Sequence, residues 1–156
     1  MTEDTMTHSS ALWGLPDPDR EAEFYQDIPM KRFFAWVIDT LLTGLLTLLI
    51  VPFTAFTALF FLPLLYVTVN FIYRVVSISR HSATPGMRLV SIELRTGNGE
   101  RFDFATALLH TIGYVISVSM VIIQIVSIGF MLTNSRAQGL TDIALGTAAV
   151  NRAARS

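Results

Sequence analysis

The stretch KRFFAWVIDTLLTGLLTLLI, residues 31–50, decides the fold class of this chain. After Lys31 and Arg32 it continues through apolar side chains for long enough to cross a bilayer, since roughly 30 Å of hydrocarbon takes about 20 helical residues. One carboxylate, Asp39, interrupts the run about two helical turns from its basic end. Because a carboxylate at that depth is costly in lipid, Asp39 is expected to face protein or a water-filled cavity.

The composition of the whole chain also indicates a membrane protein. Of its 156 residues, 52% are hydrophobic and only 15% are charged, whereas soluble domains average roughly 25% charged residues. Asp, Glu, Lys and Arg are absent from positions 40–73 and again from positions 104–135. We therefore predict an all-α membrane bundle with about three transmembrane helices, or as many as four crossings, embedded in the lipid bilayer.

Several classes of function find no support in the sequence. The net charge is −1 and no basic run occurs, so no nucleic-acid partner is expected. The chain has no cysteine, and it shows no zinc-ligand spacing, phosphate-binding loop or nucleophile motif. We therefore expect no enzyme, no cofactor and no metal site.

Three regions are expected along the chain: an acidic N-terminal tail at 1–30, a membrane domain at 31–150 and a short C-terminal tail at 151–156. The tail is rich in Asp, Glu and Pro, and it lacks the basic and short apolar regions of a signal peptide. The first apolar segment is therefore expected to be a retained span.

The first two spans are predicted from their apolar runs. A helix is expected at 33–51, followed by a turn at Pro52 and a second span at about 55–76. Pro63 lies within that second span and predicts a kink.

The second apolar run, 104–133, is too long for one span and too short for two full ones. The sequence favours a leading segment at 104–110 and a span at 113–132. A re-entrant or short-hairpin path through the same residues remains as the alternative.

The polar stretch between the apolar runs predicts a small β-hairpin. RLVSIELR at 88–95 alternates apolar and polar side chains, TGNG at 96–99 is a turn signal, and ERFDF at 100–104 resumes the alternation. Just before it, ATPG at 83–86 predicts a turn in which proline presets φ and glycine accepts a positive φ. The hairpin is expected to cap the bundle with its apolar face.

Positive charge predicts the orientation. The loop at 74–103 carries five arginines, whereas the link between the first two spans has no charge. Since short loops rich in Lys and Arg stay in the cytoplasm, this loop and the N-terminus are expected to be cytoplasmic. The C-terminal segment, with a helical turn at 140–145 and a strand-like stretch at 147–150, reaches the same side only by the re-entrant or short-hairpin path.

Asp39 has two interpretations. Arg32 lies seven positions earlier, about 700° around a helix of 3.6 residues per turn, so both side chains project from one face. In the structural interpretation, Asp39 accepts hydrogen bonds from an arginine of the cap or from a hydroxyl. In the functional interpretation, it is a site for a proton or a cation, as intramembrane carboxylates commonly are.

Three separated motifs occur in order along the chain. An arginine opens the first span and an aspartate lies within it, at Arg32 and Asp39. ATPGMRLVSIEL follows at 83–94, and GLTDIALGTAAV at 139–150 contains Asp142. In this combination the chain resembles the RDD family of small bacterial membrane proteins, over nearly everything but the acidic tail.

The resemblance implies a multi-pass protein of the bacterial inner membrane, and some members of the family are implicated in exchange of monovalent cations and protons. Such transport would involve Na⁺, Li⁺ or H⁺, and it would require a homo-oligomer because the chain has no internal repeat. The alternative is a non-transporting assembly or interaction subunit of a membrane complex, whose charged residues are structural. Met87 stands where the family usually has a lysine, which argues against a role needing a cation there.

A charged cluster is the candidate site that the resemblance implies. Its ion or proton site would comprise Arg32, Asp39 and Asp142, with a supporting cluster of Arg88, Thr84, Pro85 and Gly86. Local reasoning leaves a second interpretation of Asp142, as a cap that accepts N–H groups at the start of a short helix. His110, within an apolar run, is expected to be a packed histidine rather than a proton relay.

Overall fold

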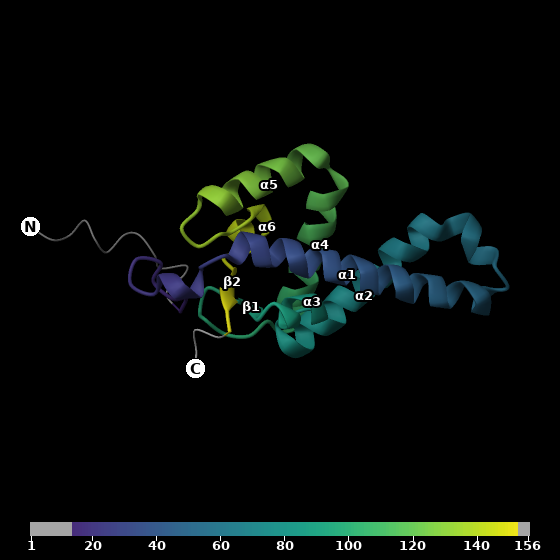
Figure 1. Cartoon of the computed structure of the whole chain (residues 1–156), viewed down its shortest axis with the longest axis horizontal. Helices are drawn as coiled ribbons and strands as arrows, with labels where there is room; N and C mark the ends of the chain where they lie inside the picture. The colour runs from purple at the N-terminus through teal and green to yellow at the C-terminus, as the bar shows by residue number, and fades with distance from the viewer. Residues whose placement is uncertain (1–13, 153–156) are drawn as a thin grey trace, which may run out of the picture.

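Two long helices, α1 (Ile28–Ile50) and α2 (Leu62–His81), run side by side as a helical hairpin that extends beyond the rest of the protein (Figure 1). The structure, a computed structural model, describes residues 14–152. Two 3₁₀ segments, η2 (Val51–Thr54) and η3 (Thr57–Phe61), connect the helices at the far end. The helical stretches Ala22–Thr54 and Thr57–His81 are each long and apolar enough to cross a membrane.

Pro63, where the sequence predicts a kink, lies at the junction of η3 and α2 rather than within one continuous helix. Pro63 lies in the first turn of α2, directly after η3. The first residues of a helix have no intrahelical acceptor for their N–H groups, so proline is tolerated there without bending the helix.

A second pair of helices, α4 (Phe104–Ser119) and α5 (Val121–Thr133), meets at Met120 with a bend of 115°. A continuous helical span at 113–132 is therefore wrong, because the helix is broken at Met120. At 1.5 Å per residue the two helices are roughly 24 Å and 20 Å long, so neither crosses a full bilayer alone. The described residues contain two spanning helices, or three if this bent pair counts as one span.

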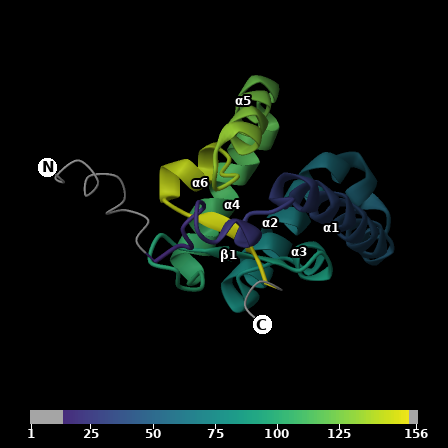
Figure 2. The same ribbon diagram turned by 60° about the vertical axis from the view of Figure 1, so that its left-hand side comes forward.

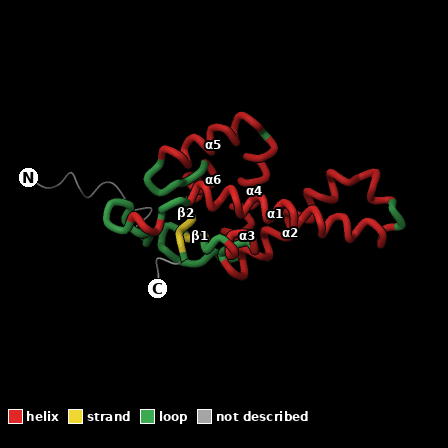
Figure 3. Tube along the Cα trace, in the orientation of Figure 1, coloured by secondary structure: helices red, strands yellow, loops and turns green. Residues whose placement is uncertain are grey.

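A small cap closes one end of the bundle (Figure 2). It contains the 3₁₀ turn η1, two short helices and the only strands in residues 14–152, which Figure 3 shows beside the predominant helices. These elements are η1 (Ala22–Phe24), α3 (Pro85–Leu89), β1 (Ile92–Arg95), α6 (Leu140–Leu145) and β2 (Ala148–Asn151). The last two agree closely with the helical turn and strand-like stretch expected at the C-terminal end.

The sheet exists, but the predicted hairpin is wrong. β1 pairs antiparallel with β2, placing Ile92 opposite Asn151 and Arg95 opposite Ala148. The stretch at 100–103 forms no strand. Pairing with β2 returns the C-terminal segment to the cap, which is the outcome expected from a path that turns back within 104–133.

Both faces of the sheet are covered, which explains why β1 is buried at all four positions despite its alternating sequence. One face joins the main core through Ile92 and Leu94. The other face packs against Leu15 and Tyr25, which belong to the stretch expected to be an acidic tail. From residue 14 onward, that stretch is therefore part of the folded cap.

Candidate functional site

Asp39 is a buried anchor between α1 and two other elements. Its side chain is only 2% exposed. Oδ1 accepts hydrogen bonds from the Tyr73 hydroxyl of α2 at 2.6 Å and from the Gly86 N–H of α3 at 2.9 Å. Oδ2 accepts one from the Thr84 hydroxyl at 2.5 Å. Neutral donors from separate parts of the chain thus surround this carboxylate, as the structural interpretation of Asp39 requires.

The ATPG motif forms the start of α3 rather than the predicted Pro-Gly turn. Thr84 is the N-cap and Pro85 lies in the first turn, where its fixed φ suits a helix. Gly86 is helical, so glycine is not needed there for a positive φ. It is needed because the backbone approaches α1 closely. A Cβ there would lie 2.4 Å from the Ala35 carbonyl oxygen and 2.7 Å from Oδ1 of Asp39. Glycine therefore permits the close approach that brings its N–H to the carboxylate.

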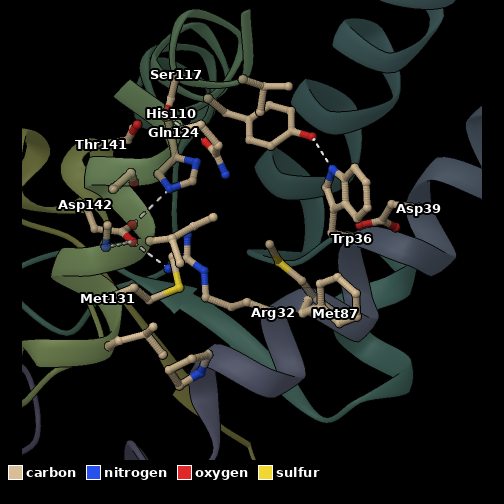
Figure 4. Close-up of a pocket in the computed structure, with 18 of the residues that line it drawn as sticks. Arg32, Trp36, Asp39, Met87, His110, Ser117, Gln124, Met131, Thr141 and Asp142 are labelled. Atoms are coloured by element: carbon tan, nitrogen blue, oxygen red, sulfur yellow. Dashed lines mark hydrogen bonds and ion pairs between the residues drawn. The ribbon is translucent and has the colours of Figure 1, made fainter. Parts of the chain in front are cut away.

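Asp142 is a second anchor, and its partners include charged groups (Figure 4). The side chain is fully buried. Oδ2 lies 2.5 Å from Arg32 Nη1 and also accepts the Gly139 N–H at 3.2 Å. Oδ1 lies 3.0 Å from His110 Nε2 and accepts the Thr147 hydroxyl at 3.0 Å. One carboxylate thus joins α1, α4, α6 and the residue preceding β2.

Electrostatics favour the ionised form of Asp142. Burial by itself raises the pKa of the carboxyl group, but the positive charge of Arg32 and the contact with His110 lower it by more. The net pKa lies well below the ordinary value for aspartate. Asp142 accepts a backbone N–H at the start of α6, as the cap interpretation predicts, and of the predicted cluster only its pair with Arg32 forms.

The structure separates residues that the motifs group together. Arg32 forms its ion pair with Asp142 and makes no salt bridge to Asp39 within residues 14–152. Arg88 is exposed at the end of α3, and its side chain has no hydrogen bond or ion pair with any described residue. Met87 is buried in the main core. His110, expected only to pack, contacts Asp142 directly.

A cavity of about 670 Å³ lies between the two anchors. Side chains from α1, α2, α4, α5 and α6 line it, and most of its lining surface is apolar. Both anchoring carboxylates reach its wall, and Figure 4 shows Arg32 extending toward Asp142 there. Its polar lining residues outside the anchors include Trp36, Arg74, Tyr114, Ser117, Gln124 and Ser127.

Arg74 is the residue of this cavity that sequence reasoning missed. It is 4% exposed, and its guanidinium carbon lies 3.7 Å from the centre of the Tyr114 ring. The Tyr114 hydroxyl in turn accepts a hydrogen bond from Trp36 Nε1 at 3.1 Å. The sequence interpretation placed Arg74 within the second span but counted its charge with the polar loop at 74–103. No Gly or Pro occurs between Arg74 and Ser82, and this absence of a helix breaker could have predicted that Arg74 lies inside α2.

Comparison with known proteins agrees with the motifs. The family model for the RDD family matches residues 28–146, which is most of the chain. The chain belongs to the RDD family. No curated protein and no solved structure shows a significant match to it. As an RDD protein with two helices able to span a bilayer, it is a membrane protein.

In this RDD protein, Arg32 and Asp142 form one anchor and Asp39 forms another, so the three motif residues do not make one site. Within residues 14–152, no group of three or more His, Cys, Asp or Glu side chains is placed to hold a metal ion. The anchors instead fix the walls of a largely apolar cavity that contains a buried arginine. That cavity has free space for a small ligand.

Proposed function

We propose that this protein binds a small solute in the cavity between α1, α2, α4 and α5, and that it belongs to the transport class of membrane proteins. The observation that supports this is a cavity of about 670 Å³ in the membrane domain, a size typical of small-molecule sites. Its apolar walls and few convergent polar groups are also typical of such sites.

The two carboxylates are better explained as anchors than as cation ligands. Tyr73, Thr84 and Gly86 donate to Asp39, while Arg32 occupies one oxygen of Asp142. Each of these donors occupies a lone pair of the carboxylate, which leaves fewer lone pairs to coordinate an approaching Na⁺ or Li⁺ ion. A lowered pKa also makes Asp142 a poor proton carrier near neutral pH.

Access to the cavity can be tested with single cysteines, since the native chain has none. Ser117→Cys places a thiol on the cavity wall, whereas Thr111→Cys places one at a buried position of the same helix that does not line the cavity. A solute site predicts that small methanethiosulfonate reagents modify Ser117→Cys at least about ten-fold faster. Equal, slow modification would contradict solute binding and favour a non-transporting assembly subunit.

Exchange of monovalent cations and protons at Asp39 is a second candidate. Two of the three donors to Asp39 are hydroxyl groups, which can rotate and present oxygen lone pairs to a cation. Asp39 also lines the cavity, which would provide a route of entry. Proteoliposomes should then show Na⁺- or Li⁺-driven proton movement that Asp39→Asn abolishes. Well-folded protein without such movement would exclude this candidate.

The proposed setting is the inner membrane of a bacterium, with the cap and the N-terminus in the cytoplasm. The four arginines of 80–103 and the return of β2 to β1 support this orientation. Transport by so small a chain would require a homo-oligomer. Labelling of cysteines at Arg88 and Phe53, at opposite ends of the helical hairpin, would test the orientation, since only the former should react from the cytoplasm.

A further inference from the structure

We propose that the cavity binds an amphipathic anion, with its phosphate or carboxylate head group on Arg74 and Arg32 and its hydrocarbon chain along α5. This inference deepens the proposed function, because it names the chemical class of the solute. It rests on the charges that the fold leaves unmatched at the cavity wall.

Arg74 is a buried cation without a matching anion. No carboxylate lies within salt-bridge distance of it among the described residues, and its Nε atom is buried without a hydrogen-bond partner. The ring of Tyr114 contacts the guanidinium group, but a ring face is a weaker partner than an anion. A buried guanidinium is costly unless it is paired, and a bound carboxylate or phosphate would supply two acceptor oxygens in a matching geometry.

Arg32 adds a second positive group to the same cavity. Its Nη1 atom contacts Asp142, and the Arg32 side chain makes no other hydrogen bond to described residues. The side chain is held in place by that contact and retains free donors, which lie at the cavity wall. Asp39, the other carboxylate at the wall, is already supplied with donors. The unused hydrogen-bonding capacity of the two arginines therefore favours an anion over a cation.

The rest of the cavity is suited to a hydrocarbon chain. Its apolar lining includes Val118 at the end of α4 and Ile128, Met131 and Leu132 on α5. Figure 2 shows α5 standing apart from α1, and large apolar side chains of both helices are exposed. A free inorganic anion would leave this apolar portion unused, whereas an amphiphile would fill both parts.

Trp36 provides a direct test because it lines the cavity. In a Trp13→Phe background it is the sole tryptophan, so its fluorescence reports on ligands that carry a bromine quencher. The probes are 11-bromoundecyl phosphate, 11-bromoundecanoate and 11-bromoundecyltrimethylammonium, with protein in phosphatidylcholine nanodiscs. The two anions should quench at concentrations at least about ten-fold lower than the cation, which differs in head-group charge but shares the chain.

Variants identify the contacts. Arg74→Gln should remove the preference for anionic probes, Arg74→Lys should retain most of it, and the exposed Arg88→Gln should leave it unchanged. Ile128→Phe, which adds bulk to the apolar wall on α5, should weaken binding of the long-chain anions. Size-exclusion profiles matching the unsubstituted protein would show that each variant is folded.

Three results would overturn the proposal: equal quenching by anionic and cationic probes, an undiminished anion preference in Arg74→Gln, or inorganic phosphate competing as well as the alkyl phosphate. The first two results would exclude contacts between the arginines and the anionic head group. The third would exclude recognition of the ligand's hydrocarbon chain. Ser117→Cys labelling separates these failures from failure of the proposed function, because a reactive thiol with no anion preference would indicate a solute of different chemistry.

Discussion

Asp39 and Asp142 are both buried carboxylates that attach α1 to distant parts of the chain, but their partners differ in kind. Asp39 accepts hydrogen bonds from two hydroxyl groups and one backbone N–H. Asp142 faces the guanidinium of Arg32 and the imidazole of His110, besides neutral donors. The first anchor lies within the helical hairpin and α3, and the second joins α1 to α4 and the C-terminal segment.

The difference shows how a membrane protein can satisfy a carboxylate in two environments. Within the apolar hairpin, neutral donors supply hydrogen bonds without burying a second charge. At the edge of the cap, an ion pair carries a smaller desolvation penalty, because the Arg32 side chain remains 18% exposed. We therefore expect the Asp142 anchor to depend on charge and the Asp39 anchor to depend on close packing.

The largest expected effect is that of Asp142→Asn. It removes the charge facing Arg32 while leaving the guanidinium in place, and breaking a buried pair in this way costs about 3–5 kcal/mol. Unfolding in detergent, followed by circular dichroism, should show this loss. A cost below about 1 kcal/mol would mean that the ion pair is not an anchor.

Acidification should weaken the same anchor. Because the folded-state pKa of Asp142 is lowered, its stabilising contribution is complete above the unfolded-state pKa of about 3.9 and is lost as pH falls toward the folded-state value. Stability should therefore decline below about pH 4 more steeply in the unsubstituted protein than in Asp142→Asn. Parallel pH profiles would contradict the assignment.

Gly86→Ala tests the packing of the Asp39 anchor. The added Cβ would approach the Ala35 carbonyl oxygen and the Asp39 carboxylate, so we expect a cost of about 3 kcal/mol, at the upper end for overpacking. Gly44→Ala is the matched control on α1, since a Cβ there meets nothing within 4 Å. Thermal unfolding of the two variants should separate them clearly, and equal midpoints would count against the close approach.

Tyr73→Phe should have the smallest effect. It removes one donor and leaves Asp39 with two others, so the expected cost is about 1.5 kcal/mol. Tyr66→Phe is the control, because the Tyr66 hydroxyl lies 3.5 Å from Thr43 Oγ1 and contacts no carboxylate. If both variants lost the same stability, the hydrogen bond to Asp39 would not be the cause.

Local patterns predicted much of the fold. Apolar runs correctly predicted the first two spanning segments, and the pattern at the C-terminal end predicted α6 and a strand. The partner of β1 could not be predicted, because the turn signal at 96–99 favours a local hairpin, while the observed pairing depends on burial of the second sheet face by Leu15 and Tyr25.

The motif residues of the anchors could be predicted, but their grouping could not. Arg32 and Asp39 share a helix face, which suggested one cluster. Their partners come from segments that are distant in sequence: Asp142 for Arg32, and Tyr73 with Thr84 for Asp39. Periodicity within a helix carries no information on such contacts.

Arg32 serves the Asp142 anchor, and the Asp39 anchor is independent of it. Two double-mutant cycles, measured by reversible unfolding in mixed micelles, test this most directly. One cycle combines Arg32→Gln with Asp142→Asn, and the other combines Arg32→Gln with Asp39→Asn. We expect a coupling of about 2–3 kcal/mol in the first cycle and less than about 0.5 kcal/mol in the second. A coupling of Arg32 to Asp39 as large as that to Asp142 would contradict two separate anchors and restore a single three-residue site.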